Sequence, residues 1–315
     1  MADLPTADWP ALAHAAGLTT IGTHVFPHQV AQFIESEPGQ AFLERCGALG
    51  LAVEHELHAM SDLLPRELFA EDPTMFRMDK AGDRVGDANF CVHSSDAIEV
   101  ICENAIRYAR VLRPTTGRYF LWIDDGQPMC HCPQCRPYSD SDQALLLENR
   151  LLLALREVDA NASLAHLAYL NTLSPPTEVR PEPGVFLEFA PITRSWDAPL
   201  SERGTPCRDQ SRQPGADHGY LLDMLDANLE VFPRHAAQVL EYWLDVSLFS
   251  GYRTPAVRLP WRADVCAADV RTYGRRGIRH ITTFVAMIDG AYIERFGEPP
   301  VDEYGAILLG YSGEP

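Results

Sequence analysis

Residues 118–126 read Arg-Tyr-Phe-Leu-Trp-Ile-Asp-Asp-Gly. The apolar and aromatic run predicts a buried strand, and the two aspartates and the glycine end it. In a barrel of parallel strands, the catalytic groups follow the C-terminal ends of the strands. This stretch therefore predicts both a core strand and a candidate site.

Further apolar runs of strand length lie on both sides of this one, and most are separated by helical patterns. This alternation predicts an α/β fold with a parallel sheet. The eight runs are 18–26, 51–58, 89–93, 118–123, 163–170, 185–190, 238–245 and 279–287. Eight strands with mostly helical connections indicate a single (β/α)8 TIM barrel over residues 1–315.

The connection after the fifth run is expected to be irregular, because residues 171–184 carry too many prolines for a helix. A doubly wound open sheet is the structural alternative. Such a sheet usually has a glycine-rich phosphate loop after its first strand. Here the first run continues into Phe-Pro-His-Gln-Val, at residues 26–30, with no such loop.

Composition excludes several classes of protein. The chain has 315 residues, 46% hydrophobic and 22% charged, which is ordinary for a globular protein. Its 26 basic and 44 acidic residues give a net charge of −18, which argues against a nucleic-acid partner. No stretch resembles a membrane span or a signal peptide, so we expect a cytoplasmic chain with no membrane partner and mostly reduced cysteines.

Asp124 and Asp125 form the first candidate catalytic pair. Repulsion between two adjacent carboxylates raises one pKa and leaves a protonated acid beside an ionised one. The following Gly126 allows a sharp turn that lets both face a ligand. The alternative is a solvated loop in which one aspartate caps a helix.

Other carboxylates lie within predicted strands. Alternation places Glu241, Trp243 and Asp245 on one face of the run 238–245. If this face points into the barrel mouth, Glu241 is a second candidate catalytic residue beside a tryptophan that can stack on a sugar; the alternative is an outer face covered by a helix. Glu188 lies inside an apolar run and needs a partner or a function, and Arg194 is the nearest candidate partner.

Several side chains are expected to bind substrate. Aromatic rings provide stacking platforms for sugars, and polar groups bind hydroxyls or a carboxylate, although each ring can equally belong to the core. The candidates are His58, Tyr169, Glu188, Arg194, Trp196 and Trp243.

Cys130, Cys132 and Cys135 form a dense thiol cluster in the sequence Cys-His-Cys-Pro-Gln-Cys. Three thiols can hold a structural Zn²⁺ if a distant residue supplies a fourth ligand, and the alternative is free, partly buried thiols. No cofactor is expected to be required for catalysis, since no nucleotide-binding or metalloprotease motif is present.

Three longer stretches resemble a known family. They are residues 58–101, residues 119–135 with the pattern Asp-Gly-x-x-x-Cys-x-Cys-Pro-x-Cys, and residues 167–196 with Tyr169 and the Pro175-Pro176 pair. Together they resemble the glycosidase-like barrels of domain-of-unknown-function family 4838, from about Val53 to Val285. The resemblance implies a TIM barrel that acts on carbohydrate. In that family Asn often stands where this chain has Asp124, which favours Asp125 as the essential acid.

The expected activity is therefore that of a glycoside hydrolase on a small or oligomeric glycoside. In one mechanism, similar to that of O-GlcNAcase-like barrels, Asp124 and Asp125 support substrate-assisted hydrolysis of an N-acetylhexosaminide. In the other, Asp125 and Glu241 are the acid and the nucleophile or base, as in a uronidase or another glycosidase. A silent carbohydrate-binding barrel and a metal-dependent isomerase using Glu56, His58 and Glu188 remain open.

Overall fold

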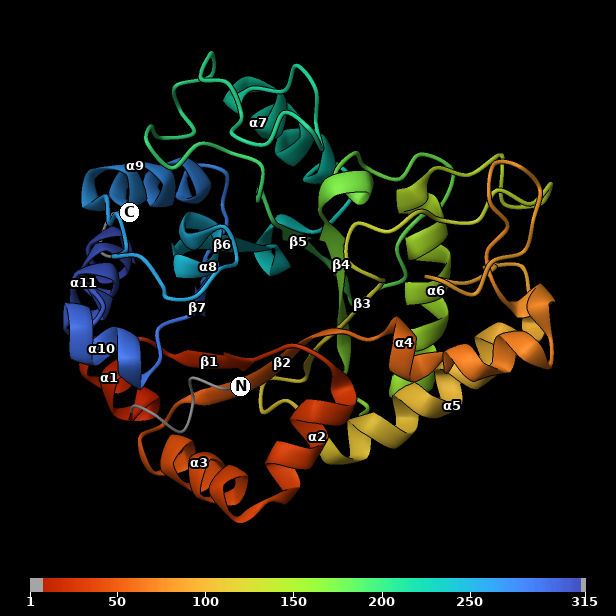
Figure 1. The fold of residues 1–315 in the computed structure, drawn as a ribbon, viewed down its shortest axis with the longest axis horizontal. Coiled ribbons are helices and arrows are strands. Elements are labelled where there is room, and N and C mark those ends of the chain that lie inside the picture. The colour runs from red at the N-terminus through yellow and green to blue at the C-terminus, as the bar shows by residue number, and fades with distance from the viewer. Residues whose placement is uncertain (1–7, 313–315) are drawn as a thin grey trace.

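The computed structural model describes residues 8–312, and it contains one parallel sheet whose strands follow one another in chain order. Helices surround the strands (Figure 1). The strands are β1 (Thr20–Thr23), β2 (Ala52–His58), β3 (Arg118–Trp122), β4 (Ser163–Ala168), β5 (Val185–Phe189), β6 (Gln238–Asp245) and β7 (His280–Ala286). The α-helices are α1 (Trp9–Ala15), α2 (Pro27–Glu35), α3 (Glu37–Ala48), α4 (Met60–Leu63), α5 (Ser95–Val111), α6 (Asp140–Leu155), α7 (His218–Asn228), α8 (Val246–Ser250), α9 (Ala263–Gly274), α10 (Gly290–Phe296) and α11 (Val301–Ser312). Short 3-10 turns are η2 (Arg66–Ala70), η3 (Pro73–Met75), η4 (Leu170–Thr172) and η5 (Arg234–Ala236).

The central strands are buried on both faces. Every residue of β5 and β6 is buried, as expected for strands covered by helices outside and by side chains inside. Helix α6 shows how local sequence fixes a boundary. The Ser139 and Asp142 side chains each bond the other's backbone N–H, so the helix begins at Asp140.

The sheet curls until side chains from opposite sides meet. Gln238 of β6 donates through its Nε2 to Glu188 of β5 at 3.1 Å and to Glu56 of β2 at 3.3 Å. Arg118 of β3 donates to the Oε1 of Gln238 at 2.9 Å. The result is a partly closed barrel with a packed interior.

The predicted eight-stranded barrel is thus only partly found. Seven strands are described, and β1 and β7 do not pair through hydrogen bonds among them. At this seam the rings of His24 and Phe284 lie 4.8 Å apart, and α11 packs against both α1 and α9. A Cβ on Gly274 of α9 would lie 1.8 Å from the Tyr311 ring, so these two helices approach closely.

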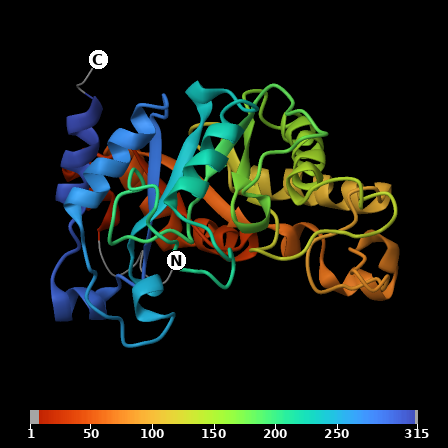
Figure 2. The same ribbon diagram turned by 90° about the horizontal axis from the view of Figure 1, so that it is seen from above.

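The prediction of a strand at 89–93 is wrong. This segment is irregular and lies in the connection between β2 and α5, which Figure 2 shows at one end of the molecule. Its side chains serve other purposes, since Phe90 is buried and the side chains of Asn89 and Cys91 bond to the loop after β3. The irregular connection before β5 is as predicted, with only η4 at its start.

None of the described helices is both long and apolar enough to cross a membrane. The expectations of a cytoplasmic location and of a single domain over residues 1–315 stay predictions.

Candidate active site

A pocket of about 190 Å³ opens at the C-terminal ends of the strands. Because the strands are parallel, these ends meet on one side of the barrel, where catalytic groups of such folds gather. The lining residues lie near the C-terminal ends of all seven described strands, and many of them are aromatic. They are His24, His58, Trp122, Asp125, Leu167, Tyr169, Ile192, Arg212, Leu240, Tyr242, Asp245, Ser247, Tyr252, Phe284 and Ala286.

Two carboxylates line this pocket, Asp125 after β3 and Asp245 at the end of β6. Asp125 is exposed, whereas Asp245 is buried. The Oδ1 of Asp245 accepts hydrogen bonds from the backbone N–H of Ser247 at 2.9 Å and from its hydroxyl at 2.5 Å. Burial raises the pKa of Asp245 above its usual value, although these hydrogen bonds oppose the change.

An irregularity in β6 determines which of its side chains reach the pocket. The pairing with β7 shifts register between Glu241 and Leu244. Such a bulge changes the parity of inward-facing positions. Tyr242 and Asp245 therefore both line the pocket, although regular alternation would place them on opposite faces.

Glu241 and Trp243, both predicted to be in the site, lie outside the pocket. Glu241 accepts hydrogen bonds from Arg194 at 2.6 Å and from the Tyr273 hydroxyl. The indole of Trp243 donates to Asp269 of α9 at 3.3 Å. The carboxylate of Glu241 does not reach the pocket, because it is fully buried against Arg194, which follows β5 and also pairs with Asp269 of α9.

Arg194 is likewise a structural residue. Its side chain is fully buried and contacts Glu241 and Asp269, both at 2.6 Å. Burial opposes its charge, but these carboxylates raise its pKa above the usual value. The expected pairing with Glu188 is not found, and Arg194 is not available to a sugar carboxylate in the pocket.

Asp124 is held away from the pocket. It pairs with Arg66 and accepts a hydrogen bond from the backbone N–H of Asn89 at 2.5 Å. Its own N–H donates to the Asn89 side chain at 3.0 Å. The two neighbouring aspartates thus have separate environments: Asp124 fixes the loop, and Asp125 faces the pocket.

Glu188 lies beneath the pocket as part of its floor. It accepts from the Trp122 indole at 2.8 Å, and Trp122 is the residue that lines the pocket. Burial, reinforced by the neighbouring Glu56, raises the pKa of Glu188 well above its usual value. Burial, with the charge of Glu54, likewise raises the pKa of Glu56 to about 8. Glu56 is therefore mostly protonated at neutral pH, and burial favours the protonated form of Glu188 as well.

The raised pKa of Glu56 predicts that the stability of the protein depends on pH. The unfolded chain releases the Glu56 proton at its ordinary pKa near 4.5, whereas the folded protein keeps it up to about pH 8. The free energy of unfolding should therefore fall as pH rises across this range. We expect Glu56→Gln to reduce that fall between pH 5 and 8 by about 2 kcal/mol or more, measured by urea unfolding. The exposed Glu103→Gln serves as the control, and parallel curves for wild type and Glu56→Gln would contradict the prediction.

Of the other predicted binding residues, His58 and Tyr169 line the pocket. Trp196 does not, because it is buried and packs its ring 5.7 Å from that of Phe249. His24, which follows β1, also lines the pocket, and its ring Nδ1 donates to the Glu56 carbonyl at 2.6 Å. Burial and the neighbouring His58 lower the pKa of His24 to about 3, so its ring is neutral.

Four further pocket residues were not predicted from the sequence to belong to the site. They are Tyr242, Asp245, Arg212 and Tyr252. Alternation placed Tyr242 on the face opposite Glu241, whereas Asp245 lay on the same expected face as Glu241 but was not chosen as a site residue. Arg212 and Tyr252 lie on loops with no distinguishing pattern, and Tyr252 is 68% exposed. Such an exposed ring beside a pocket is a signal that only the structure gives.

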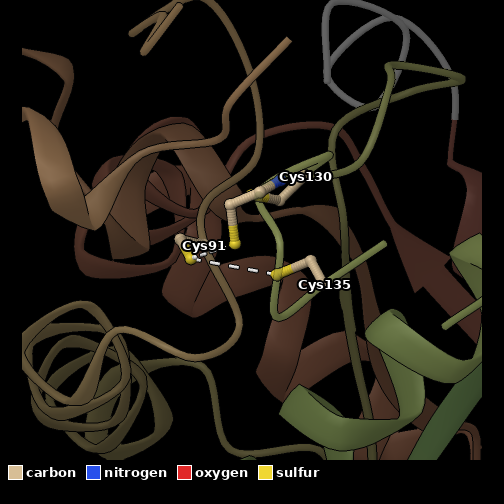
Figure 3. Close-up of side chains that lie close together, drawn as sticks. Cys91, Cys130 and Cys135 are labelled. Carbon is tan, nitrogen blue, oxygen red and sulfur yellow. Dashed lines mark hydrogen bonds between the residues drawn. The ribbon is translucent and has the colours of Figure 1, made fainter. Parts of the chain in front are cut away.

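The three clustered cysteines meet a fourth. The sulfur atoms of Cys91, Cys130, Cys132 and Cys135 lie within 4.8 Å of one another, and all four residues are buried. Figure 3 shows the side chains of Cys91, Cys130 and Cys135 pointing toward a common centre. Cys91 comes from the segment wrongly predicted to be a strand.

The fold is shared with glycoside hydrolases of low sequence identity. The chain aligns over 96% of its length with a β-galactosidase from the psychrophilic Marinomonas ef1, with a TM-score of 0.56 and 11% identity. It aligns equally fully with Gan42B, a GH42 β-galactosidase, with a TM-score of 0.54 and 12% identity. It spans 56% and 54% of these two chains, so it corresponds to about half of each.

The family follows from the sequence itself. Residues 32–213, more than half of the chain, match the model of the domain of unknown function DUF4838. The chain therefore belongs to this family, as the sequence resemblance predicted. No curated protein matches it.

Proposed function

We propose that this chain is a glycoside hydrolase whose two working carboxylates are Asp125 and Asp245. The observation that carries the proposal is that both line one aromatic pocket at the C-terminal ends of the strands. Glycosidases use a pair of carboxyl groups on either side of the scissile bond. The likeness in fold to two β-galactosidases supports the same reaction class.

The pocket provides what sugar hydrolysis needs. One carboxyl protonates the departing oxygen, while the other attacks the anomeric carbon or activates water. The rings of Trp122, Tyr242 and Tyr252 offer apolar faces to a sugar. The neutral His24 and the neighbouring His58 offer ring nitrogens for hydroxyl groups.

The geometry favours this pair over the two arrangements expected from the sequence. Substrate-assisted hydrolysis by Asp124 and Asp125 needs Asp124 at the substrate, but its carboxylate is engaged by Arg66 and Asn89. The pair of Asp125 and Glu241 needs a carboxylate that is instead buried against Arg194.

A uronide is the second candidate substrate, and Arg212 favours it. Arg212 is exposed and lines the pocket together with Asp125. It can therefore bind a sugar carboxylate, the role predicted from the sequence for Arg194. A guanidinium binds a sugar carboxylate through charge-assisted hydrogen bonds. If the substrate is a uronide, we expect Arg212→Gln to raise its KM about 10- to 100-fold and to change the KM of a neutral glycoside much less.

The proposal is tested with a panel of aryl glycosides: galactoside, glucoside, mannoside, glucuronide and N-acetylglucosaminide. Wild type is compared with the double variant Asp125→Asn/Asp245→Asn and with Asp197→Asn. Asp197 is exposed and lies outside the pocket, so it controls for the chemical change. We expect the wild type and Asp197→Asn to release the chromophore and the double variant to release none above background.

Three outcomes would overturn the proposal. Equal turnover by the folded double variant would place the reaction elsewhere. If calorimetry detects sugar binding but no substrate is turned over, the chain is a carbohydrate-binding barrel. Isomerisation of a free sugar that requires an added divalent metal, with no chromophore released from the panel, would favour the isomerase class instead. Circular dichroism of each variant confirms folding before activity is compared.

A further inference from the structure

We propose that Cys91, Cys130, Cys132 and Cys135 bind one Zn²⁺ in a closed tetrahedral site that fastens the loop after β3. The four residues come from two segments, the irregular connection before α5 and the loop between β3 and α6. The site lies outside the pocket, whose lining includes none of these residues.

The distances between the sulfur atoms match a zinc tetrahedron. Zinc–sulfur bonds of about 2.3 Å give a tetrahedron with edges of about 3.8 Å. Cys91 Sγ lies 3.7 Å from Cys132 Sγ and 3.8 Å from Cys135 Sγ. A disulfide needs about 2.05 Å, and all four thiols are free in the structure.

Hydrogen-bond donors surround the sulfur atoms as they do around metal-bound thiolates. The backbone N–H groups of Met78 and Cys132 point to Cys130 Sγ at 3.3 and 3.5 Å. The ring Nδ1 of His93 lies 3.3 Å from Cys135 Sγ. Arg84 lies 3.8 Å from Cys130 Sγ and supplies positive charge. Such outer contacts orient ligands and offset the negative charge of four thiolates around one divalent ion.

The ligand set selects the metal and its role. Four buried thiolates suit a soft or borderline ion and not magnesium or calcium. Four protein ligands leave no open position for substrate, so the ion would be structural. Among the described residues, no other group of His, Cys, Asp or Glu side chains is gathered in this way.

The position of the site links it to the pocket. Asn89, close to Cys91 in the chain, donates through its Nδ2 to the carbonyls of Gln127 and Pro128 at 3.1 and 3.0 Å. It also bonds Asp124, as described above. Binding of Zn²⁺ would fix Asn89 against this loop and so hold Asp125 in place. This last step rests on the proposed function, whereas the metal site itself does not.

The direct test is the metal content of the full chain. The protein is purified without chelators, and its metals are measured by inductively coupled plasma mass spectrometry. We expect about one zinc per chain in wild type and in Cys102→Ser, and almost none in Cys91→Ser. Cys102 lies on α5 outside the cluster and is the matched control. Replacing zinc with Co²⁺ should give the intense visible absorption of tetrahedral cobalt thiolate in wild type and not in Cys91→Ser.

A second measurement covers the case in which Cys91→Ser fails to fold. Chelator treatment of the wild type should lower the Tm by about 5 °C or more, and added Zn²⁺ should restore it. Wild type with neither zinc nor cobalt uptake overturns the proposal, and so does an iron-bearing or disulfide-bonded cluster. These readouts do not depend on turnover, so a failed glycosidase assay leaves them intact.

Discussion

Replacing either Asp125 or Asp245 with asparagine is expected to lower kcat/KM for the best aryl glycoside by about 10²- to 10⁴-fold. Each substitution keeps the shape of the side chain but removes a group that transfers a proton or attacks carbon. The Asp197→Asn control should stay within about twofold of wild type, since it changes no group in the pocket. Loss of activity in only one of the two variants would contradict a two-carboxylate mechanism.

Rescue experiments can show which of Asp125 and Asp245 is the general acid. An aryl glycoside whose leaving group needs no protonation should restore much of the activity of the variant that lacks this acid. Added azide should rescue the alanine variant of the nucleophile in a retaining enzyme, because a small anion replaces the missing carboxylate. We expect each rescue at one position and not at the other. Rescue of neither variant would mean that at least one carboxylate acts only by positioning.

Arg194→Met is expected to destabilise the protein by about 3–5 kcal/mol. The substitution leaves Glu241 and Asp269 buried without the cation that each contacts at 2.6 Å. Desolvation of unpaired charge then outweighs the added apolar contacts of methionine. Urea unfolding at neutral pH measures the change directly.

Arg262→Met is the matched control for this prediction. Arg262 pairs with Asp264 at 2.8 Å, but both side chains are largely exposed. An exposed pair contributes little, so the change should stay below about 1 kcal/mol. A similarly small effect at Arg194 would show that the buried carboxyls take up protons or water at little cost.

Much of the fold was predictable because its strands are short, apolar and separated by helices. Seven of the eight expected runs are strands, including 118–123 and 238–245 to within a residue or two. The run 89–93 was wrongly predicted to be a strand because buried apolar residues such as Phe90 and Cys91 occur both in strands and in packed loops. Burial alone produces the apolar pattern, and periodicity does not separate the two cases over five residues.

The site was harder to predict than the fold. Strand ends indicated Asp125, His58 and Tyr169, which do line the pocket. Alternation grouped Glu241 with Asp245, but a bulge between them puts the two side chains on different faces, and that bulge depends on pairing with β7, which a single strand's sequence does not reveal. The partner of Arg194 and the position of Cys91 depend on contacts between distant segments. Residues such as Asp269 of α9 give no local sign of these contacts.

The bulge in β6 makes the position of a pocket residue depend on residues outside the pocket. Just before the bulge, Glu241 is fastened to the outer shell by Arg194 and Tyr273, and just after it Asp245 faces the pocket. The placement of Asp245, one of the two proposed catalytic groups, thus depends on a salt bridge on the opposite side of the strand. Mutations in α9, which contributes nothing to the pocket lining, can therefore shift Asp245 without changing any residue of the pocket.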